Sequence, residues 1–516
     1  MKRIIIILIL SVFISSCEDL LDKEPQTTLS EKLFWQTEKD LNAAVNGLYN
    51  CLHSDNPGTS GVSAFDQFGM LDVMTEIAAS RAAAPFAAVA NGSFGSGHKI
   101  IATRWTECYR AVVRANDIMA HIDAMNVDED LRSVLKGETL FLRAWFYFNL
   151  VYFFGDVPLI LDVPTLENAY VSRNPKDEVI DQMHQDLDDA LALLPTSPRE
   201  TGRVAKGAAL TLKAKIHMQE LEYAEAIPVL EEIIGLGYSL YDNYRTLFLV
   251  EGENNSEVIF NAEYTSGTGK KQGNSFNTLY GNKSMLGTGW SWFLPTKELI
   301  EMYETKEDGL PDPKPLYDRK DPRMDMTVMR PGSTFLDKND VVKKYPEQVQ
   351  NYSHTETGFH CRKFVIEGSS PDAPFTGLWD SPQNWIFFRY ADVLLLYAEA
   401  VNEVEGPQAE VYDAVNQIRS RPGVQMPPVE TGKSKDELRE IIRHERAVEL
   451  ALEGWRYFDL KRWGLLQEVN DGFKVINIRN GKTVVTRIFE EHNNLWPIPL
   501  TELDRNPNLR PQNPGY

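Results

Sequence analysis

The spacing of hydrophobic residues predicts a protein built mainly from α-helices. Between residues 174 and 195, apolar side chains recur at helical spacing until Pro195 stops the pattern: Val179, Met183, Leu187, Leu191 and Leu194. A second amphipathic run covers 438–452. The same periodicity predicts helices near 38–53, 100–125, 130–154, 203–235, 386–404 and 408–420. Strand-like runs are few, such as 258–262 and 483–488.

One pair of predicted helices, within 210–237, is similar to a helix hairpin of the tetratricopeptide type. In such a hairpin small residues let the helices approach and an aromatic residue fills the angle between them, positions taken here by Leu210, Ala214, Tyr223, Ala226 and Leu230. By contrast, 251–292 and 305–384 are rich in Gly, Asn, Ser, Pro and Asp. We expect long irregular loops there, and ligand contacts are commonly made by such loops.

The N-terminus carries the features of an export signal. Two basic residues precede an apolar run at 4–14, which is too short for a membrane span of ~20 residues. The sequence Ile14-Ser15-Ser16-Cys17 resembles a bacterial lipobox. We therefore expect a signal peptide at 1–16 and an acylated N-terminus at Cys17 with a polar tether to residue 36. A plain secretory signal with an incidental cysteine is the alternative. No later segment reads as a membrane span, so the membrane contact is expected through the lipid alone.

Composition narrows the class of partner. A share of 43% hydrophobic and 25% charged residues is typical of a folded globular protein. Asp and Glu total 74 against 53 Lys and Arg, a formal net charge of −21. Such a surface repels phosphate backbones, so no nucleic-acid partner is expected. The remaining cysteines, Cys51, Cys108 and Cys361, are scattered and form no CxxC pair.

Catalytic motifs are largely missing. His444-Glu445 opens an HExxH pattern, but Val448 stands where the second zinc ligand belongs. Gly267-Thr268-Gly269-Lys270 fails as a phosphate-binding loop, and no GxSxG nucleophile appears. A carboxylate pair for glycoside hydrolysis cannot be located among so many acids. The pattern favours a binding protein over an enzyme, with no catalytic residue and no cofactor.

Several separated stretches together resemble the SusD/RagB family of outer-membrane lipoproteins of the Bacteroidetes type. In chain order they are Asp40 to Tyr49, Arg143 to Phe148 followed by Gly155 to Leu159, Arg389 to Leu395, Glu445-Arg446, Glu453 to Arg456, Asp459 to Trp463, Trp496 to Pro499 and Asn506 to Tyr516. Together, in this order, these stretches cover the mature chain from end to end.

The resemblance implies more than the composition does. It implies a SusD-like fold, in which tetratricopeptide-like helix pairs form a scaffold and irregular loops form the ligand face. We divide the chain at residue 250, into an N-terminal helical part (37–250) and a C-terminal part with loop insertions (251–516). Such proteins sit on the cell surface over a SusC-like TonB-dependent barrel and deliver oligosaccharides to it, or peptides in the RagB branch. Glu18 and Asp19 resemble the acidic export signal of surface lipoproteins.

Sugar capture needs aromatic faces and polar partners. The apolar face of a pyranose stacks on Trp or Tyr, and its hydroxyls need hydrogen-bond partners. Most tryptophans lie in helical or scaffold contexts and are expected in the core. Loop context and positional analogy with SusD-type sites give the candidate ligand contacts Trp290, Trp292, Trp379, Phe86, Asn91, Phe94 and Tyr280, with Arg81 and Asp380 as polar candidates.

Three alternatives stay open at this stage. Trp292 precedes Phe293-Leu294-Pro295, so it could pin a loop to the next helix, and Arg81 could be a solvated helix end. A peptide-binding lid of the RagB kind would share the whole fold. A surface glycoside hydrolase would also suit a secreted, acidic, aromatic-rich chain. Some SusD-like proteins carry calcium, but no DxDxDG loop is present, and we expect no metal.

Overall fold

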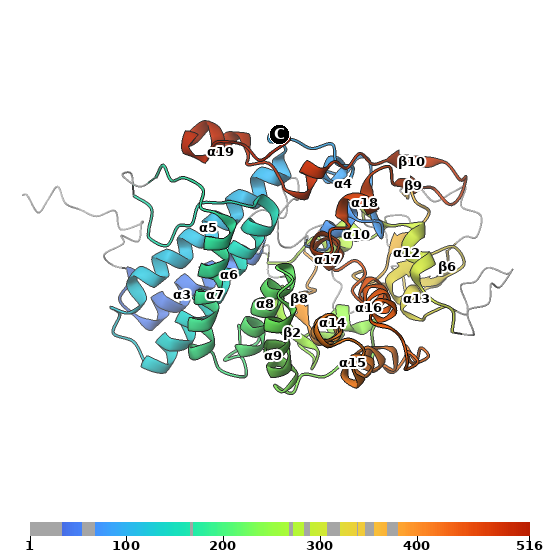
Figure 1. Cartoon of the computed structure of the whole chain (residues 1–516), viewed down its shortest axis with the longest axis horizontal. Helices are drawn as coiled ribbons and strands as arrows, with labels where there is room; N and C mark the ends of the chain where they lie inside the picture. The colour runs from blue at the N-terminus through green and yellow to red at the C-terminus, as the bar shows by residue number, and fades with distance from the viewer. Residues whose placement is uncertain are drawn as a thin grey trace, which may run out of the picture.

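The computed structural model describes residues 34–53, 68–165, 169–267, 272–282, 289–306, 320–337, 339–345, 355–368 and 380–516. Helices dominate these residues, so the prediction of a mainly α protein is confirmed (Figure 1). Cys17, the signal peptide and Trp379 lie outside the described residues.

The regular elements follow the chain in this order. The helices are α3 (Glu38–Tyr49), α4 (Ala87–Ala90), α5 (Lys99–Ile122), α6 (Glu129–Phe154), α7 (Lys176–Leu193), α8 (Lys206–Gln219), α9 (Tyr223–Ile234), α10 (Phe276–Tyr280), α12 (Lys297–Met302), α13 (Arg323–Thr327), α14 (Tyr390–Glu405), α15 (Ala409–Arg419), α16 (Lys435–Glu449), α17 (Trp455–Arg462), α18 (Leu466–Asn470) and α19 (Leu500–Arg505). The strands are β1 (Ala78–Ser80), β2 (Val258–Ala262), β3 (Phe293–Pro295), β4 (Val328–Met329), β5 (Thr334–Leu336), β6 (Val342–Lys344), β7 (His360–Cys361), β8 (Trp385–Arg389), β9 (Lys474–Ile476) and β10 (Thr483–Thr486).

Helix α6 lies at the centre of the N-terminal half. It packs against α5 on one side and α7 on the other, as Figure 1 shows. Every residue from Gly137 to Phe154 is buried, which explains why this stretch is apolar on all faces of the helix. Asp128 caps the N-terminus by accepting a hydrogen bond from the backbone N–H of Leu131.

The predicted tetratricopeptide-like hairpin is present as α8 and α9. The chain turns between them at Leu221, whose φ of 59° lies in the left-handed region. Ala214, Ala226 and Leu230 are buried where the two helices meet. Helix α14 then packs against α9 and is followed by α15 and α16, so helices from the two halves of the sequence lie side by side (Figure 1).

The structure corrects one boundary. We expected a helix from residue 386, but Trp385–Arg389 forms strand β8 and the helix begins at Tyr390. Strand β8 pairs antiparallel with β2 more than 120 residues earlier, Ala262 lying opposite Trp385. All five β8 residues are buried, so the apolar run reflects a strand covered on both faces rather than one side of a helix.

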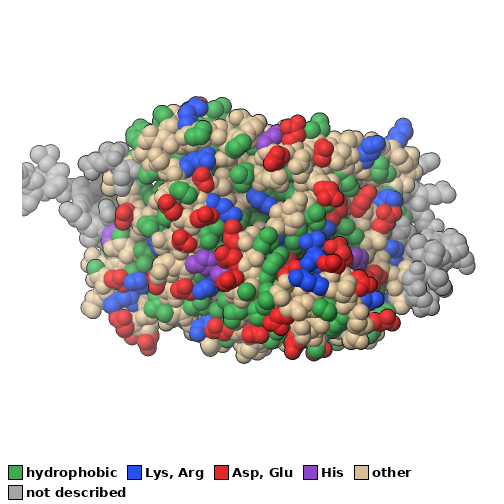
Figure 2. Space-filling view, in the orientation of Figure 1, with side chains coloured by type: hydrophobic (Ala, Val, Ile, Leu, Met, Phe, Trp, Pro, Cys, Tyr) green, Lys and Arg blue, Asp and Glu red, His purple; other side chains and the backbone are tan. Residues whose placement is uncertain are grey.

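The other described sheets are also two-stranded and antiparallel, and their strands are short. They pair β1 with β3, β4 with β7, β5 with β6, and β9 with β10. Figure 2 shows acidic and basic side chains interspersed with hydrophobic ones over one face of the molecule. Among the residues that the structure describes, no helix has the length and the hydropathy needed to cross a bilayer.

A buried network of ionised side chains joins α16 to the loops and to β8. Its members are the cations Arg323, Lys363, Arg389, Arg419 and Arg421 and the acids Glu257, Asp321, Glu445, Glu449 and Glu453. Arg389 shows the pattern, because it donates to Glu257, Glu449 and Glu453 at 2.7–2.8 Å. Buried charges are tolerated when they are paired in this way. All ten members lie in the C-terminal part of the chain (251–516), so the network fixes how the segments of that part meet.

Candidate functional site

Backbone hydrogen bonds hold Trp290 and Trp292, which lie just before β3, in a fixed place. Strand β3 pairs with β1 so that Ser80 lies opposite Phe293. The pairing continues past the strands, because the Arg81 N–H donates to the Trp292 carbonyl at 3.0 Å. On the other side, the Trp290 and Trp292 N–H groups donate to the carbonyls of Thr278 and Leu279. This segment is therefore held on both sides.

The local backbone is also tightly constrained. Ser291, between the two tryptophans, is fully buried and has a φ of 50°. Its hydroxyl donates to the Gly281 carbonyl and accepts from the Asn282 amide. Gly289 has a φ of 119°, and a Cβ there would lie 2.2 Å from the Gly281 carbonyl oxygen. Only glycine fits at that position.

The side chains of Trp290 and Trp292 form a pair. Their ring centroids are 4.7 Å apart and the ring planes meet at 44°. Both side chains are half-buried and pack partly against the hydrophobic core. Such a tilted, half-buried pair offers apolar area for stacking. We call Trp290 and Trp292 the indole pair.

Polar groups lie beside the indole pair. The Arg81 guanidinium donates from Nη1 to the Trp290 carbonyl at 3.0 Å. Next to it, the Ala82 N–H donates to Oε2 of Glu356 at 2.9 Å, and Glu356 is half-buried. A guanidinium and a carboxylate both have further hydrogen-bonding capacity. The combination suits a ligand with an apolar face and a hydroxyl rim.

Three predicted ligand contacts lie in the core instead. Phe86, Phe94 and Tyr280 are 2%, 7% and 0% exposed. The Phe94 ring packs near Trp496 and Tyr516, while Tyr280 packs against Phe293. Tyr280 is the last residue of α10 and Phe86 directly precedes α4, and analogy of sequence position could not reveal that all three side chains turn inward. We correct these three assignments to core residues.

Two further candidates, Asp380 and Asn91, form hydrogen bonds with other parts of the chain. Asp380 accepts a hydrogen bond from the Gly267 N–H at 3.0 Å, and Ser381 bridges to Asn274. Asp380 therefore lies beside Gly267 and Gly273. Asn91 follows α4, which contacts β1, and its carbonyl accepts from the Ile488 N–H at 3.1 Å. Any ligand role of Asn91, Asp380 and the indole pair stays a prediction.

Two cavities open elsewhere in the described part of the chain. One, of about 520 Å³, is lined by charged residues that include Arg245, Lys320 and Arg362. Arg245 and Lys320 donate to backbone carbonyls, and Arg362 is paired with Glu367. These cations are therefore engaged by the protein itself. The other cavity, of about 550 Å³, lies beside the C-terminus and is lined by Glu490, Glu491, His492, Asn494, Leu495, Pro514 and Gly515.

Sequence reasoning missed two features. Glu356 accepts a hydrogen bond from Ala82, the neighbour of Arg81, across 274 positions of sequence, and no local signal marks it. A group of His184, His217 and Glu222 comes together from α7, α8 and the turn after α8. Helical periodicity places the two histidines on neighbouring helices, but only the packing of those helices brings them into contact.

Comparison with known families covers most of the chain. A model described as the SusD family matches residues 256–516, and one described as starch-binding associating with outer membrane matches residues 19–218. The chain is similar to SusD-like protein P25 of Formosa agariphila, with 29% identity covering 98% of this chain and 96% of that protein. SusD-like protein P2 of the same organism is 27% identical over the full length of both chains.

Solved structures give the same result. A SusD-like protein from Bacteroides fragilis has a TM-score of 0.81 at 26% identity, covering 94% of this chain and 99% of that one. A SusD-like carbohydrate-binding protein from the same species has a TM-score of 0.80 at 26% identity, covering 92% and 100%. A laminarin-binding SusD-like protein has a TM-score of 0.73 at 25% identity, covering 93% and 100%. With a family model matching half of the sequence, the chain belongs to the SusD family.

Proposed function

We propose that this protein captures oligosaccharides at the cell surface and delivers them to a SusC-like TonB-dependent barrel in the outer membrane. The ligand stacks on the indole pair of Trp290 and Trp292, and Arg81 and Glu356 bind its hydroxyl groups. Lipid on Cys17 anchors the chain to the membrane. No chemical step is involved, so the protein acts as a binding protein and not as an enzyme.

The observation that carries the proposal is the indole pair itself. Both rings are half-buried, and hydrogen bonds from the backbone of Trp290 and Trp292 hold them before any ligand arrives. A preorganised aromatic surface loses little conformational freedom on binding. The adjoining Arg81 and Glu356 add a donor and an acceptor beside an apolar face, which is the combination that a sugar ring requires.

The comparisons support a glycan as the ligand class. The family is one of SusD-like carbohydrate-binding proteins, and its N-terminal model is described as starch-binding and associated with the outer membrane. One structural neighbour is a laminarin-binding protein, and another is a carbohydrate-binding protein. We extend the ligand class, but not the identity of the glycan, to this chain. A peptide ligand, as in a RagB-like lid, and glycoside hydrolysis are the competing functions.

Replacing Trp290 with alanine tests the proposed surface. Truncating an aromatic anchor usually costs more than ~1–2 kcal/mol of binding free energy, so affinity for an oligosaccharide should fall about tenfold or more. The melting temperature should change little because the indole is only half-buried. Titration calorimetry measures the affinity, and a thermal unfolding scan measures the melting temperature.

Trp35→Ala is the matched control. Trp35 is also half-buried, but its ring stacks on that of His121 in α5. This variant should bind oligosaccharide like the wild type. Unchanged affinity in Trp290→Ala together with a large drop in melting temperature would make Trp290 a scaffold residue. New reducing ends released from a glycan by the purified protein would show hydrolysis instead of simple capture.

A further inference from the structure

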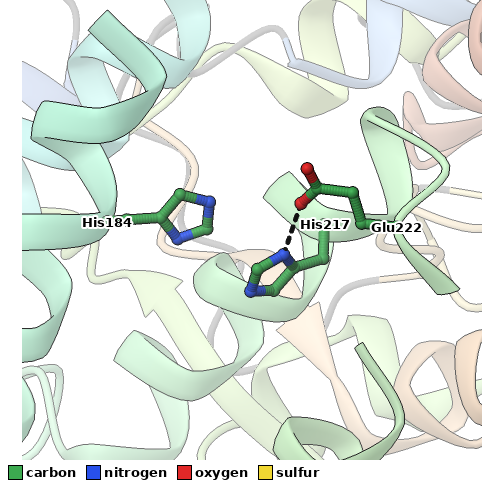
Figure 3. Close-up of side chains that lie close together, drawn as sticks. All are labelled: His184, His217 and Glu222. Carbon is green, nitrogen blue, oxygen red and sulfur yellow. Dashed lines mark hydrogen bonds and ion pairs between the residues drawn. The ribbon is translucent and has the colours of Figure 1, made fainter. Parts of the chain in front are cut away.

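Two histidines and a glutamate from consecutive helices meet on the helical scaffold (Figure 3). His184 lies in α7, His217 near the end of α8, and Glu222 directly before α9. One ligand atom from each residue lies within 4.8 Å of the other two. The sequence predicts no metal, since it has no DxDxDG loop, and His184 and His217 are 33 positions apart.

The His184 imidazole has the properties of a metal ligand. Its Nδ1 is buried and has no hydrogen-bond partner among the described residues. Its ring stacks on that of His217, with centroids 4.5 Å apart and planes at 29°. An imidazole with an unused buried nitrogen beside a second imidazole offers a ligand atom to a metal ion.

The other two groups complete a set of ligands. His217 and Glu222 are joined through Nδ1 and Oε2 at 2.7 Å. The His217 side chain is 13% exposed and that of Glu222 is 46% exposed, so an ion has a path from solvent. Lys213 is the nearby cation, and it is paired with Asp188. Its charge is therefore largely compensated.

We propose that His184, His217 and Glu222 form a binding site for Zn²⁺ or a similar transition-metal ion. Two imidazole nitrogens and one carboxylate oxygen are a common ligand set for zinc, with water in the remaining position. Ligands ~2.1 Å from a tetrahedral zinc lie about 3.4 Å from one another. That separation falls between the 2.7 Å hydrogen bond and the 4.8 Å limit found here. Small side-chain rotations are enough to bind the ion.

The donor atoms also decide which ions are excluded. Calcium and magnesium prefer oxygen ligands, and this site supplies two nitrogens. The bound ion would connect α7, α8 and the turn before α9, three parts of the helix-pair scaffold. We therefore expect zinc to stabilise the folded chain, whatever ligand the indole pair binds, because an ion that binds only the folded state favours that state.

Zinc titration of the mature chain tests the site. The protein is used without its signal peptide and after removal of any histidine tag. Calorimetry should show one equivalent of Zn²⁺ bound, and the melting temperature should rise with Zn²⁺ but not with Ca²⁺ or Mg²⁺. His184→Gln and Glu222→Gln should each weaken zinc binding by at least about tenfold, because loss of even an outer partner of a metal ligand costs that much.

Two comparisons decide the outcome. His492→Gln is the control. Like His217, His492 pairs with a carboxylate, that of Glu490 at 3.3 Å, but it belongs to no group of three ligands among the described residues. The His492→Gln variant should bind zinc like the wild type. The half-exposed Glu222 can be replaced without disturbing the core, so that variant answers the question even if His184→Gln unfolds. Zinc binding that is absent in the wild type, or unchanged in Glu222→Gln and in a folded His184→Gln, would overturn the proposal.

Discussion

Glu449 is the acid on which the buried ionic network depends most. It accepts hydrogen bonds from Arg323, Arg389 and Arg421 at 2.7–2.8 Å, and all four side chains are at most 1% exposed. Burial alone would raise the pKa of Glu449, but Arg421, Arg389 and Arg323 outweigh it and hold that pKa well below its usual range. The carboxylate is therefore ionised throughout the ordinary pH range.

Glu449→Gln removes the charge and keeps the shape. Three guanidinium groups then share one neutral amide, whose NH₂ group also points toward cations. Removing one partner of a buried ion pair typically costs about 3–5 kcal/mol, because the remaining charge stays buried without compensation. We expect the free energy of unfolding at pH 7 to fall by about that amount. Urea unfolding followed by tryptophan fluorescence measures it.

A surface pair provides the control. Glu440 is paired with Arg443 on the same helix, but its side chain is 72% exposed. Exposed pairs contribute only ~0–1 kcal/mol, so Glu440→Gln should leave stability nearly unchanged. If the free energy of unfolding of Glu449→Gln also lies within about 1 kcal/mol of the wild-type value, the network does not depend on this charge and the reasoning fails.

The lowered pKa of Glu449 also determines the direction in which its contribution to stability changes with pH. Because the folded pKa of Glu449 is lowered, its contribution is present above the pKa of the unfolded chain, about 4.3, and is lost as the pH falls below it. The stability difference between the wild type and Glu449→Gln should thus be largest near neutrality. It should shrink below pH 4.

Three other predictions concern burial, anchoring and partnership. Burial raises the pKa of Asp72 to about 8, so the free energy of unfolding of the wild type should fall as the pH rises from 4 toward 8, because only the unfolded chain loses this proton there. In urea unfolding, Asp72→Asn should gain ~1 kcal/mol or more of stability relative to the wild type across that range. The same pH profile for both proteins would contradict this. Cys17→Ala should leave a folded protein that no longer sediments with outer membranes; a variant that still does so would refute the lipid anchor. The wild type should co-purify in mild detergent with a TonB-dependent barrel through an interface above ~2,000 Å². Finding only free protein alongside that barrel would count against a complex of the two.

The helical part of the fold was predictable because its signal is local. The apolar repeat from Val179 to Leu194 needs only one helix face, and α7 ends at Leu193, close to the predicted stop. Strand β8 was not predictable, because its partner β2 is remote in sequence and the run of buried residues fits a helix equally well. The antiparallel pairing of β8 with β2 makes this run a strand and not a helix.

The candidate site was predictable only in part. Trp145 and Trp496 are buried as their scaffold context predicts, but Trp35 and Trp463, also expected in the core, are half-buried like Trp290 and Trp292. Positional analogy failed for Phe94, because a position in sequence does not show whether the side chain turns into the core. The charged residues of α16 look like a solvated face in sequence. Their burial arises from partners such as Arg323, which lies 126 positions from Glu449.

A calorimetric titration of the wild-type protein tests the central claim most directly. Panels of neutral oligosaccharides and of peptides of similar length are titrated into the mature chain under identical conditions. The account predicts saturable binding of at least one oligosaccharide, at about 0.1–1 mM or tighter, which corresponds to roughly −4 to −5.5 kcal/mol or more. It predicts no binding of peptides. Saturable binding of peptides with no heat from any oligosaccharide would contradict glycan capture.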